Sequence, residues 1–143
     1  MNRYPVTRAK DITRSWHLVD AKGKILGRLA AEITPILAGK NKSYYVPYLD
    51  CGDNVVVVNT AHIKVTGRKE KQKIYYRHSQ YPGGLKTETL GELRARKPED
   101  LIYKAVWGMM PKGRLGRQMI KKLHVFAEAE HPFQDKFKTA SSD

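Results

Sequence analysis

Four valines follow one another without a polar residue between them, from Val55 to Val58. A strand with one face in water alternates apolar and polar residues, because successive side chains point to opposite faces of the sheet. An unbroken apolar run is typical of a strand covered on both faces, as in a parallel sheet. Parallel neighbours need crossover connections, so the run predicts a sheet whose strands alternate with helices.

The segment before the valines supplies a first strand and a first helix. Residues 16–20 (WHLVD) are predicted to form a short strand, and Gly39 is a natural stop for the helix that follows. Pro35 lies inside that helix, where it removes a hydrogen bond and crowds the preceding turn, so we expect a kink or a tightened last turn. The helix itself is predicted from apolar residues at the spacing of one helical face: Leu26, Leu29, Ala30, Ile33 and Leu37.

The second half of the chain is predicted to be mainly helical. Residues 63–66 and 73–77 are expected to be short strands, and helical signals begin at residue 87. Thr89 and Glu92 have the spacing of a capping box, and Pro98 is placed to begin a further helix. That helix has a predicted buried stripe and ends before Pro111: Leu101, Ile102, Ala105, Val106 and Met109.

The chain then continues with a short basic helix over about 115–122 and a final strand over 123–126. We expect residues 1–143 to form a single α/β domain, with an extension over 1–14. The polar residues 131–143 are expected to form a tail that is mobile or held only by a partner.

Net charge narrows the class of partner. The chain carries 27 Lys and Arg against 14 Asp and Glu, a net charge of +13, which favours a nucleic-acid or anionic-membrane partner. No apolar run approaches the roughly 20 residues of a membrane span, and no basic amphipathic anchor helix is evident. The N-terminus lacks the apolar core of a secretory signal.

One cysteine, Cys51, excludes an internal disulfide and a multi-cysteine zinc site, and fits a reducing cytosol.

The segment 67–86, GRKEKQKIYYRHSQYPGGLK, combines six Lys or Arg with a single acid, Glu70. Tyr75, Tyr76, Tyr81 and His78 lie between the cations, and a Pro-Gly-Gly turn follows. Cations beside flat aromatic rings suit the phosphates and unstacked bases of RNA, and the two glycines of the turn allow the backbone to approach its sugars closely.

A second basic run covers 111–122, where five cations occur without an acid. A helix start beside these cations would offer backbone N–H groups to a phosphate. Lys40 and Lys42, after the first helix, form a weaker case. A solvated basic face is the alternative for any single run; the repetition of the pattern favours RNA.

Catalytic alternatives have less support. Asp50 and Asp53 could form a metal-binding or acid–base pair, or a polar turn before the buried strand. The five histidines show no metal-ligand spacing, and no glycine-rich phosphate fingerprint is present. We therefore expect no cofactor, no metal, no small-molecule substrate and no enzymatic activity.

Several motifs occur in order along nearly the whole chain: WHLVDA, ILGRLA, DCGDNVVVVN, TGRK, KIYYRHSQYPGGLK, AVWGMMPKGRLGR and KKLHVFAEAEHP. In this combination the chain resembles the bacterial type of the large-subunit ribosomal protein thirteen family. The resemblance implies a three-layer α/β/α domain with a central, mostly parallel or mixed sheet. It also implies a structural constituent of the large subunit of cytoplasmic ribosomes, which binds rRNA beside other ribosomal proteins and supports early assembly.

Two groups of residues are predicted to contact RNA. The first group matches RNA-facing or motif-bearing segments of the family: Arg28, Lys69, Tyr75, Tyr76, Arg77, His78, Gly83, Gly84, Lys86, Lys112, Arg114 and Arg117. The second group belongs to the basic runs: Lys40, Lys42, Arg68, Lys71 and Lys121. Adjacent strand residues point to opposite faces, so either Tyr75 or Tyr76 is expected to pack in the core instead.

The chain departs from the family pattern at Pro35 and over 126–133, so RNA contacts of the C-terminal region are the least supported. Two alternative functions stay open. One is a regulatory protein that binds messenger RNA, and the other is a metal-dependent nucleic-acid-processing enzyme that uses Asp50 and Asp53.

Overall fold

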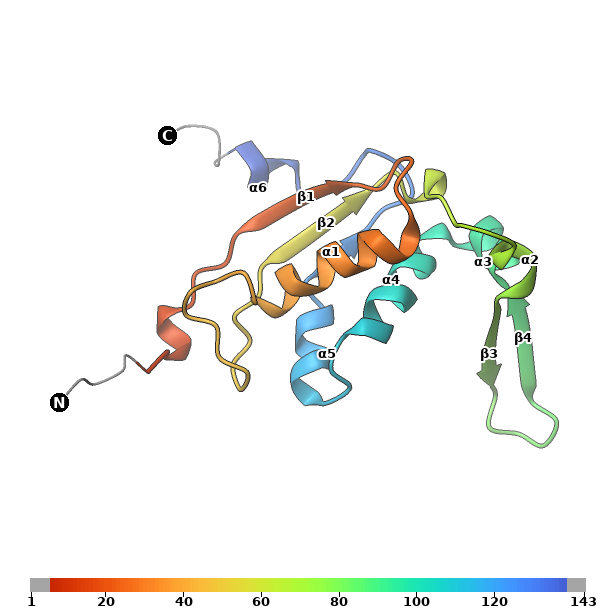
Figure 1. Cartoon of the computed structure of the whole chain (residues 1–143), viewed down its shortest axis with the longest axis horizontal. Helices are drawn as coiled ribbons and strands as arrows, with labels where there is room; N and C mark the ends of the chain where they lie inside the picture. Colours follow the sequence, from red (N-terminus) through yellow and green to blue (C-terminus); the bar gives the residue numbers. More distant parts are fainter. Residues whose placement is uncertain (1–5, 139–143) are drawn as a thin grey trace.

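The computed structural model describes residues 6–138 (Figure 1). The outer parts of the predicted extension and tail, 1–5 and 139–143, lie outside the described residues. The central sheet has three parallel strands in the order β1 (Trp16–Asp20), β2 (Asn54–Val58) and β5 (Leu123–Val125). The predicted parallel sheet and its α/β class are confirmed.

The valine run forms the middle strand, as its lack of alternation predicted. Val55, Val56 and Val57 are completely buried, and Val58 nearly so. Val55 and Val57 belong to the main apolar core. Val56 lies beside Leu18 and His124 in the sheet register, on the opposite face.

Helices cover one face of this sheet thickly. α1 (Leu26–Ala38) and α4 (Pro98–Met109) pack against each other, α1 against β2 and α4 against β5. α3 (Leu90–Arg96) packs on α4, and α5 (Arg114–Ile120) packs on α1 (Figure 1). The predicted capping box of α3 is present: Thr89 Oγ1 accepts from the Glu92 N–H, and the Glu92 carboxylate accepts from the Thr89 N–H.

The end of α1 confirms the predicted tightened last turn. The Gly39 N–H donates to the Ile36 carbonyl at 3.2 Å, and the Lys40 N–H donates to the Pro35 carbonyl at 3.0 Å. This pair of bonds is a Schellman motif, which requires a residue in the left-handed region, and Gly39 has φ +79°. Pro35 thus lies where the helix is already closing.

A two-stranded antiparallel hairpin projects from one end of the domain (Figure 1). It consists of β3 (Ile74–His78) and β4 (Leu85–Thr89), and α2 (Lys69–Gln72) precedes it. The predicted strand over 73–77 is therefore confirmed. The helical structure expected from residue 87 begins only at Leu90, because residues 87–89 belong to β4. The strand expected over 63–66 was also wrong: it reduces to one parallel bridge between Lys64 and Ile25, because the chain turns away at Gly67, which has φ +68°.

The apolar stripe of α4 differs from its prediction at one end. Leu101, Ile102 and Val106 are fully buried, whereas Met109 is 47% exposed. The helix ends at Met109. The next residue, Met110, has an extended backbone (φ −87°, ψ 155°), and its side chain is buried in place of that of Met109.

Aromatic residues from the C-terminal region cover part of the second face of the sheet. Phe133 stacks on Trp16 with ring centroids 5.1 Å apart and lies 4.5 Å from His124. α6 (Gln134–Lys138) packs on β1, while Leu18 stays 51% exposed. The sequence predicted a mobile or partner-held tail from residue 131, whereas its described part is attached to the sheet and supplies the third layer.

Candidate nucleic-acid interface

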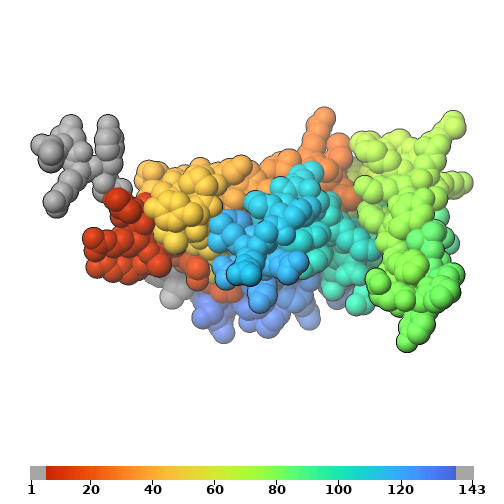
Figure 2. All heavy atoms as spheres, turned by 90° about the horizontal axis from the view of Figure 1, so that it is seen from below, coloured from red at the N-terminus to blue at the C-terminus, as the bar shows by residue number. Residues whose placement is uncertain are grey.

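The predicted RNA-contacting residues are mostly at the surface. Figure 2 shows that three basic segments lie along one elongated face: the loop after α1 (gold), the region before and within α5 (cyan), and the hairpin region (green). These segments are far apart in sequence, and the fold brings them to one side. The exposed members of the predicted set are Arg28, Lys40, Arg68, Lys69, Lys71, Tyr76, Arg77, His78, Gly83, Lys86, Lys112, Arg114, Arg117 and Lys121.

Two cations stand directly opposite each other on the hairpin. Arg77 of β3 is paired with Lys86 of β4 in the antiparallel register. Like charges in this position repel and destabilise a free hairpin. An anion between them, such as a phosphate, would convert the repulsion into two favourable contacts.

The other face of the hairpin carries exposed apolar and aromatic side chains. Tyr76 is 68% exposed, Leu85 59% and Ile74 43%. Tyr81, in the loop at the tip, is 75% exposed; it was not among the predicted contacts, although it stands in the same basic segment. Exposed rings between cations are platforms on which unpaired bases stack.

Tyr75 points the opposite way from Tyr76. Its ring is half-buried against the core, with the Lys104 ammonium 4.7 Å and the Lys73 ammonium 5.5 Å from the ring centroid. Burial raises the pKa of the Tyr75 hydroxyl. Of the two alternatives that the sequence left open, Tyr76 is the tyrosine available at the surface.

The tip of the hairpin is shaped by its glycines. The Ser79 N–H donates to the Gly84 carbonyl at 3.0 Å, and the Gly84 N–H donates to the Tyr81 carbonyl at 2.9 Å. A Cβ on Gly84 would lie 2.1 Å from Ser79 Oγ, and Gly83 has φ +69°. Gly84 therefore has a structural reason to be glycine, beside its predicted contact with RNA.

The segment before α5 is held by contacts of its own. The Lys112 ammonium donates to the Trp107 carbonyl and lies 4.8 Å from the centroid of the Trp107 ring. Gly116 packs so closely that a Cβ there would lie 1.7 Å from the Pro111 carbonyl oxygen. These contacts fix the turn that presents Arg114 and Arg117 to solvent.

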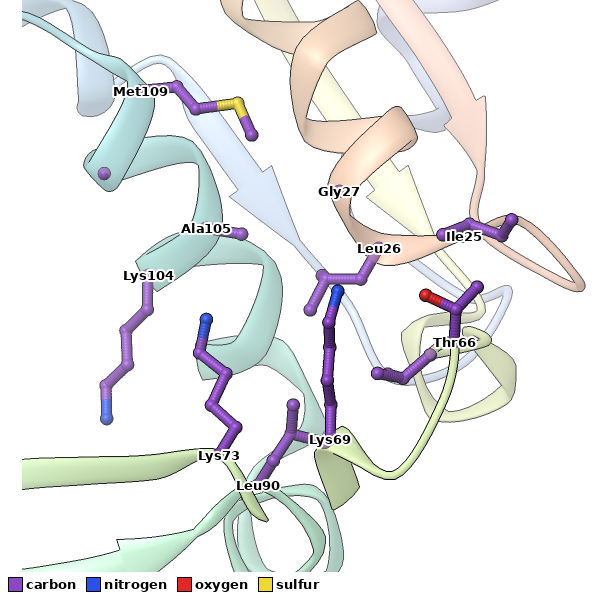
Figure 3. A pocket seen from close by; sticks show the side chains of 12 residues that line it. Ile25, Leu26, Gly27, Thr66, Lys69, Lys73, Leu90, Lys104, Ala105 and Met109 are labelled. Carbon is purple, nitrogen blue, oxygen red and sulfur yellow. The ribbon is translucent and has the colours of Figure 1, made fainter. Parts of the chain in front are cut away.

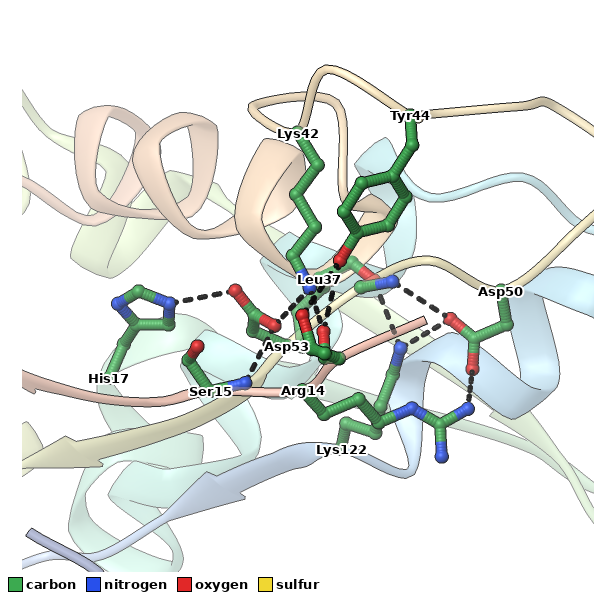
Figure 4. Close-up of polar contacts among 11 residues, drawn as sticks. Arg14, Ser15, His17, Leu37, Lys42, Tyr44, Asp50, Asp53 and Lys122 are labelled. Atoms are coloured by element: carbon green, nitrogen blue, oxygen red, sulfur yellow. Dashed lines mark hydrogen bonds and ion pairs between the residues drawn. The ribbon is translucent and has the colours of Figure 1, made fainter. Parts of the chain in front are cut away.

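Lys42 is placed differently from the other predicted contacts (Figure 4). Its ammonium lies 2.5 Å from Asp53 Oδ1 and donates to the Thr13 carbonyl, also at 2.5 Å, and its side chain is only 12% exposed. Burial lowers the pKa of Lys42, but the bonds to Asp53 and Tyr44 raise it above its usual value overall. Lys42 thus holds the N-terminal segment to the domain, and we leave it out of the proposed interface.

The two aspartates that suggested a catalytic pair belong to the same network. Burial by itself would raise the pKa of Asp53, but bonds from Lys42, the Ser15 N–H and His17 lower it below the usual value. Asp50 is paired with Lys122, whose pKa is lowered by burial against the opposing effect of Asp50. Each carboxylate therefore neutralises a buried or half-buried lysine.

No signal in the sequence indicated these pairs, because the partners are 11 residues apart for Lys42 and Asp53 and 72 residues apart for Lys122 and Asp50. Lys122 is the last cation of the basic run over 111–122, yet it is only 8% exposed. Within residues 6–138, no three His, Cys, Asp or Glu side chains gather where they could hold a metal ion. The helices of that same range include none long and apolar enough to cross a membrane.

Comparison with known proteins gives one consistent result. The model of the ribosomal protein L13 family matches residues 14–132. Among relatives named large ribosomal subunit protein uL13, the one from Geobacillus sp. (strain WCH70) is 51% identical over 90% of this chain and 89% of its own length. The relative from Dictyoglomus thermophilum is 54% identical over 90% and 91%, and that from Lachnoclostridium phytofermentans is 58% identical over 84% and 83%. The chain therefore belongs to the ribosomal protein L13 family, so it is a ribosomal protein and not an enzyme, as its resemblance implied.

Proposed function

We propose that this chain is a structural constituent of the large ribosomal subunit, and that it binds rRNA through the basic face of Figure 2. One observation carries the proposal. Two segments with several exposed cations, the hairpin region and the region of α5, share one side with the loop after α1, in a domain whose net charge is +13. The names of the relatives, which place those proteins in the large subunit, support it.

The mechanism is charge neutralisation combined with shape. Lysine and arginine side chains displace the counterions of RNA, so that RNA segments can approach each other across the protein. The packed sheet and helices act as a rigid body, and the projecting hairpin extends the contact beyond it (Figure 1). An early role in subunit assembly, beside neighbouring ribosomal proteins, is part of the proposal. No observation favours messenger RNA as the partner.

Sedimentation of cell extract on a sucrose gradient tests the proposal. The tagged full-length chain is expected to travel with the large subunit at moderate salt. A protein found mainly at the top of the gradient, without crosslinked rRNA, would contradict it. Depletion of the protein should also lead to incomplete large-subunit particles, and normal particles would contradict the assembly role.

The salt dependence of association tests the hairpin cations. Arg77→Ala/Lys86→Ala should release about two fewer counterions, so the slope of log affinity against log salt should become shallower by about 2. Lys22→Ala/Lys24→Ala is the matched control, because it removes the same charge from the turn between β1 and α1. Equal slopes for the two double variants would remove the hairpin pair from the interface.

A further inference from the structure

A hollow opens between α1, α4 and the start of the hairpin region, beside the basic face. Its volume is about 320 Å³, within the usual range of small-ligand sites. Apolar side chains form most of its wall, including Leu26, Leu90 and Met109, as Figure 3 shows. Three lysines also line it, and none of its lining residues is acidic.

Two of these lysines are available to a ligand. In Figure 3 the side chains of Lys69 and Lys73 extend into the space between α1 and α4, whereas that of Lys104 points away. The Lys104 ammonium lies over the Tyr75 ring at 4.7 Å, and the Lys73 ammonium lies 5.5 Å from the centroid of the same ring while Lys73 still lines the hollow. Within residues 6–138, neither Lys69 nor Lys73 has an ion pair with a carboxylate. The hollow thus combines an apolar wall with two ammonium groups that no acid of the described chain neutralises.

Two glycines keep the hollow open. Gly27 of α1 and Gly108 of α4 both line it, and a Cβ at either position would meet no atom of residues 6–138 within 4 Å. Glycine is less favourable than alanine within a helix. Contacts within the described residues therefore do not explain why these two positions are glycine. The free space beside the two glycines would admit a flat ligand.

The first turn of α1 adds hydrogen-bond donors. The turn contains no acid, and its N-cap residue, Ile25, makes no side-chain cap. The N–H groups of Gly27 and Arg28 belong to the first turn, where the helix supplies no acceptor for them. Such donors beside Lys69 and Lys73 suit an anionic group.

We propose that this hollow receives one unpaired nucleotide of the bound RNA. The base would lie against the apolar wall, and its phosphate would be held by Lys69, Lys73 and the first turn of α1. An apolar ring attached to a phosphate matches this combination of surfaces, and unpaired bases are the part of RNA that proteins bind in this way. The inference rests on the proposed function, because Lys69 and Lys73 lie on the chain segment that leads into the hairpin.

The test fills the hollow without changing charge. Gly108→Leu places an apolar side chain of a good helix former in the free space. Gly91→Ala, on α3 and outside the lining, is the control, and thermal unfolding verifies that both variants fold. Large subunits that carry tagged wild type or variant protein are then treated with reagents that modify exposed bases. If Gly108→Leu does not fold, Gly27→Ala takes its place as a smaller obstruction.

In wild-type and Gly91→Ala subunits, we expect protection of one rRNA nucleotide that becomes reactive with Gly108→Leu. Incorporation of Gly108→Leu in competition with wild type should fall about tenfold, the usual effect of losing a stacked base. If wild type enters the subunit and Gly108→Leu shows the same incorporation and the same protection of the nucleotide, this inference is overturned while the proposed function stands. A wild-type protein that never enters subunits would instead overturn the proposed function.

A second arm distinguishes an RNA nucleotide from a free one. Adenosine and uridine 5′-monophosphate are titrated into the free wild-type protein and into Gly108→Leu. We expect no saturable binding by either protein at micromolar concentrations, because a single nucleotide lacks the other RNA contacts. Micromolar binding that Gly108→Leu abolishes would overturn the assignment to RNA and indicate a site for a free nucleotide.

Discussion

Lys40 and Lys42 are two residues apart in one basic loop, and the fold gives them different surroundings. Lys40 is exposed, whereas the Lys42 ammonium contacts Asp53 and the Thr13 carbonyl. A lysine is available to RNA only when no acid of the same chain neutralises it. The partner of Lys42 is 11 residues away, so only the folded structure separates these two lysines.

Asp53 is expected to contribute to stability in a pH-dependent way. Its pKa is lowered in the folded protein, where burial opposes the stronger effect of Lys42, Ser15 and His17. The stabilisation is therefore complete above the unfolded pKa of about 3.9, and is lost as pH falls through the lower folded pKa. Asp53→Asn should lower the free energy of unfolding at pH 7 by roughly 3 kcal/mol, because it leaves Lys42 buried without its anion.

Denaturant unfolding between pH 7 and pH 3 measures this effect. The loss of stability on acidification should be smaller in Asp53→Asn than in wild type. Glu130→Gln, which alters an exposed carboxylate, is the control. Parallel pH profiles for wild type and Asp53→Asn would contradict the assignment.

Tyr75 and Tyr76 should respond in opposite ways to alanine substitution. Tyr76→Ala should leave stability almost unchanged and weaken RNA association by about 1–3 kcal/mol, because its exposed ring is free to stack on a base. Tyr75→Ala should lower stability by roughly 2 kcal/mol, because its ring packs against the core. Thermal unfolding and competitive incorporation measure the two effects. A larger loss of stability in Tyr76→Ala would reverse the assignment.

At the scale of elements, the end of α1 depends on one glycine for two reasons. Gly39 has φ +79°, and a Cβ there would lie 2.6 Å from the carbonyl carbon of Cys51. Gly23 has φ +74°, and a Cβ there would meet no atom of the described part of the chain within 4 Å. Gly23→Ala should cost about 1 kcal/mol from backbone strain alone, and Gly39→Ala should cost at least 2 kcal/mol more. Similar midpoints of denaturant unfolding for the two variants would show that the close approach to Cys51 is unimportant.

The hairpin shows what the sequence could and could not predict about an element. The sequence predicted a strand over 73–77, and the cations of 67–86 predicted a contact surface. β4 was missed because Thr87 and Thr89 were assigned to the start of a helix, although Thr89 is also the N-cap of α3. The like-charged pair Arg77 and Lys86 is visible only once the register of the hairpin is known.

At the scale of the whole molecule, local patterns predicted the parallel sheet and the helices that cover it. Val55–Val58 are buried as expected, and α1 ends at Gly39. Long-range contacts were not predictable from local patterns. The aromatic contact of Phe133 with Trp16, and the ion pair of Lys122 with Asp50, join residues that are far apart in the sequence.

The basic face also depends on the whole fold. Each basic run by itself is as compatible with a solvated surface as with a contact to RNA. Only the folded domain brings the hairpin region, the region of α5 and the loop after α1 to one side, with exposed tyrosines on the hairpin (Figure 2). The opposite side of the sheet carries the aromatic cluster around Trp16 and Phe133.

A map of protein–RNA crosslinks on purified large subunits tests the central claim most directly. Ultraviolet crosslinking followed by mass spectrometry of the peptides should place rRNA nucleotides on segments 67–86 and 112–121. Peptides from 131–137, which carry Phe133 of the aromatic cluster, should be free of crosslinks. Crosslinks concentrated on 131–137, with the hairpin and α5 unmodified, would contradict the assignment of the basic face to RNA.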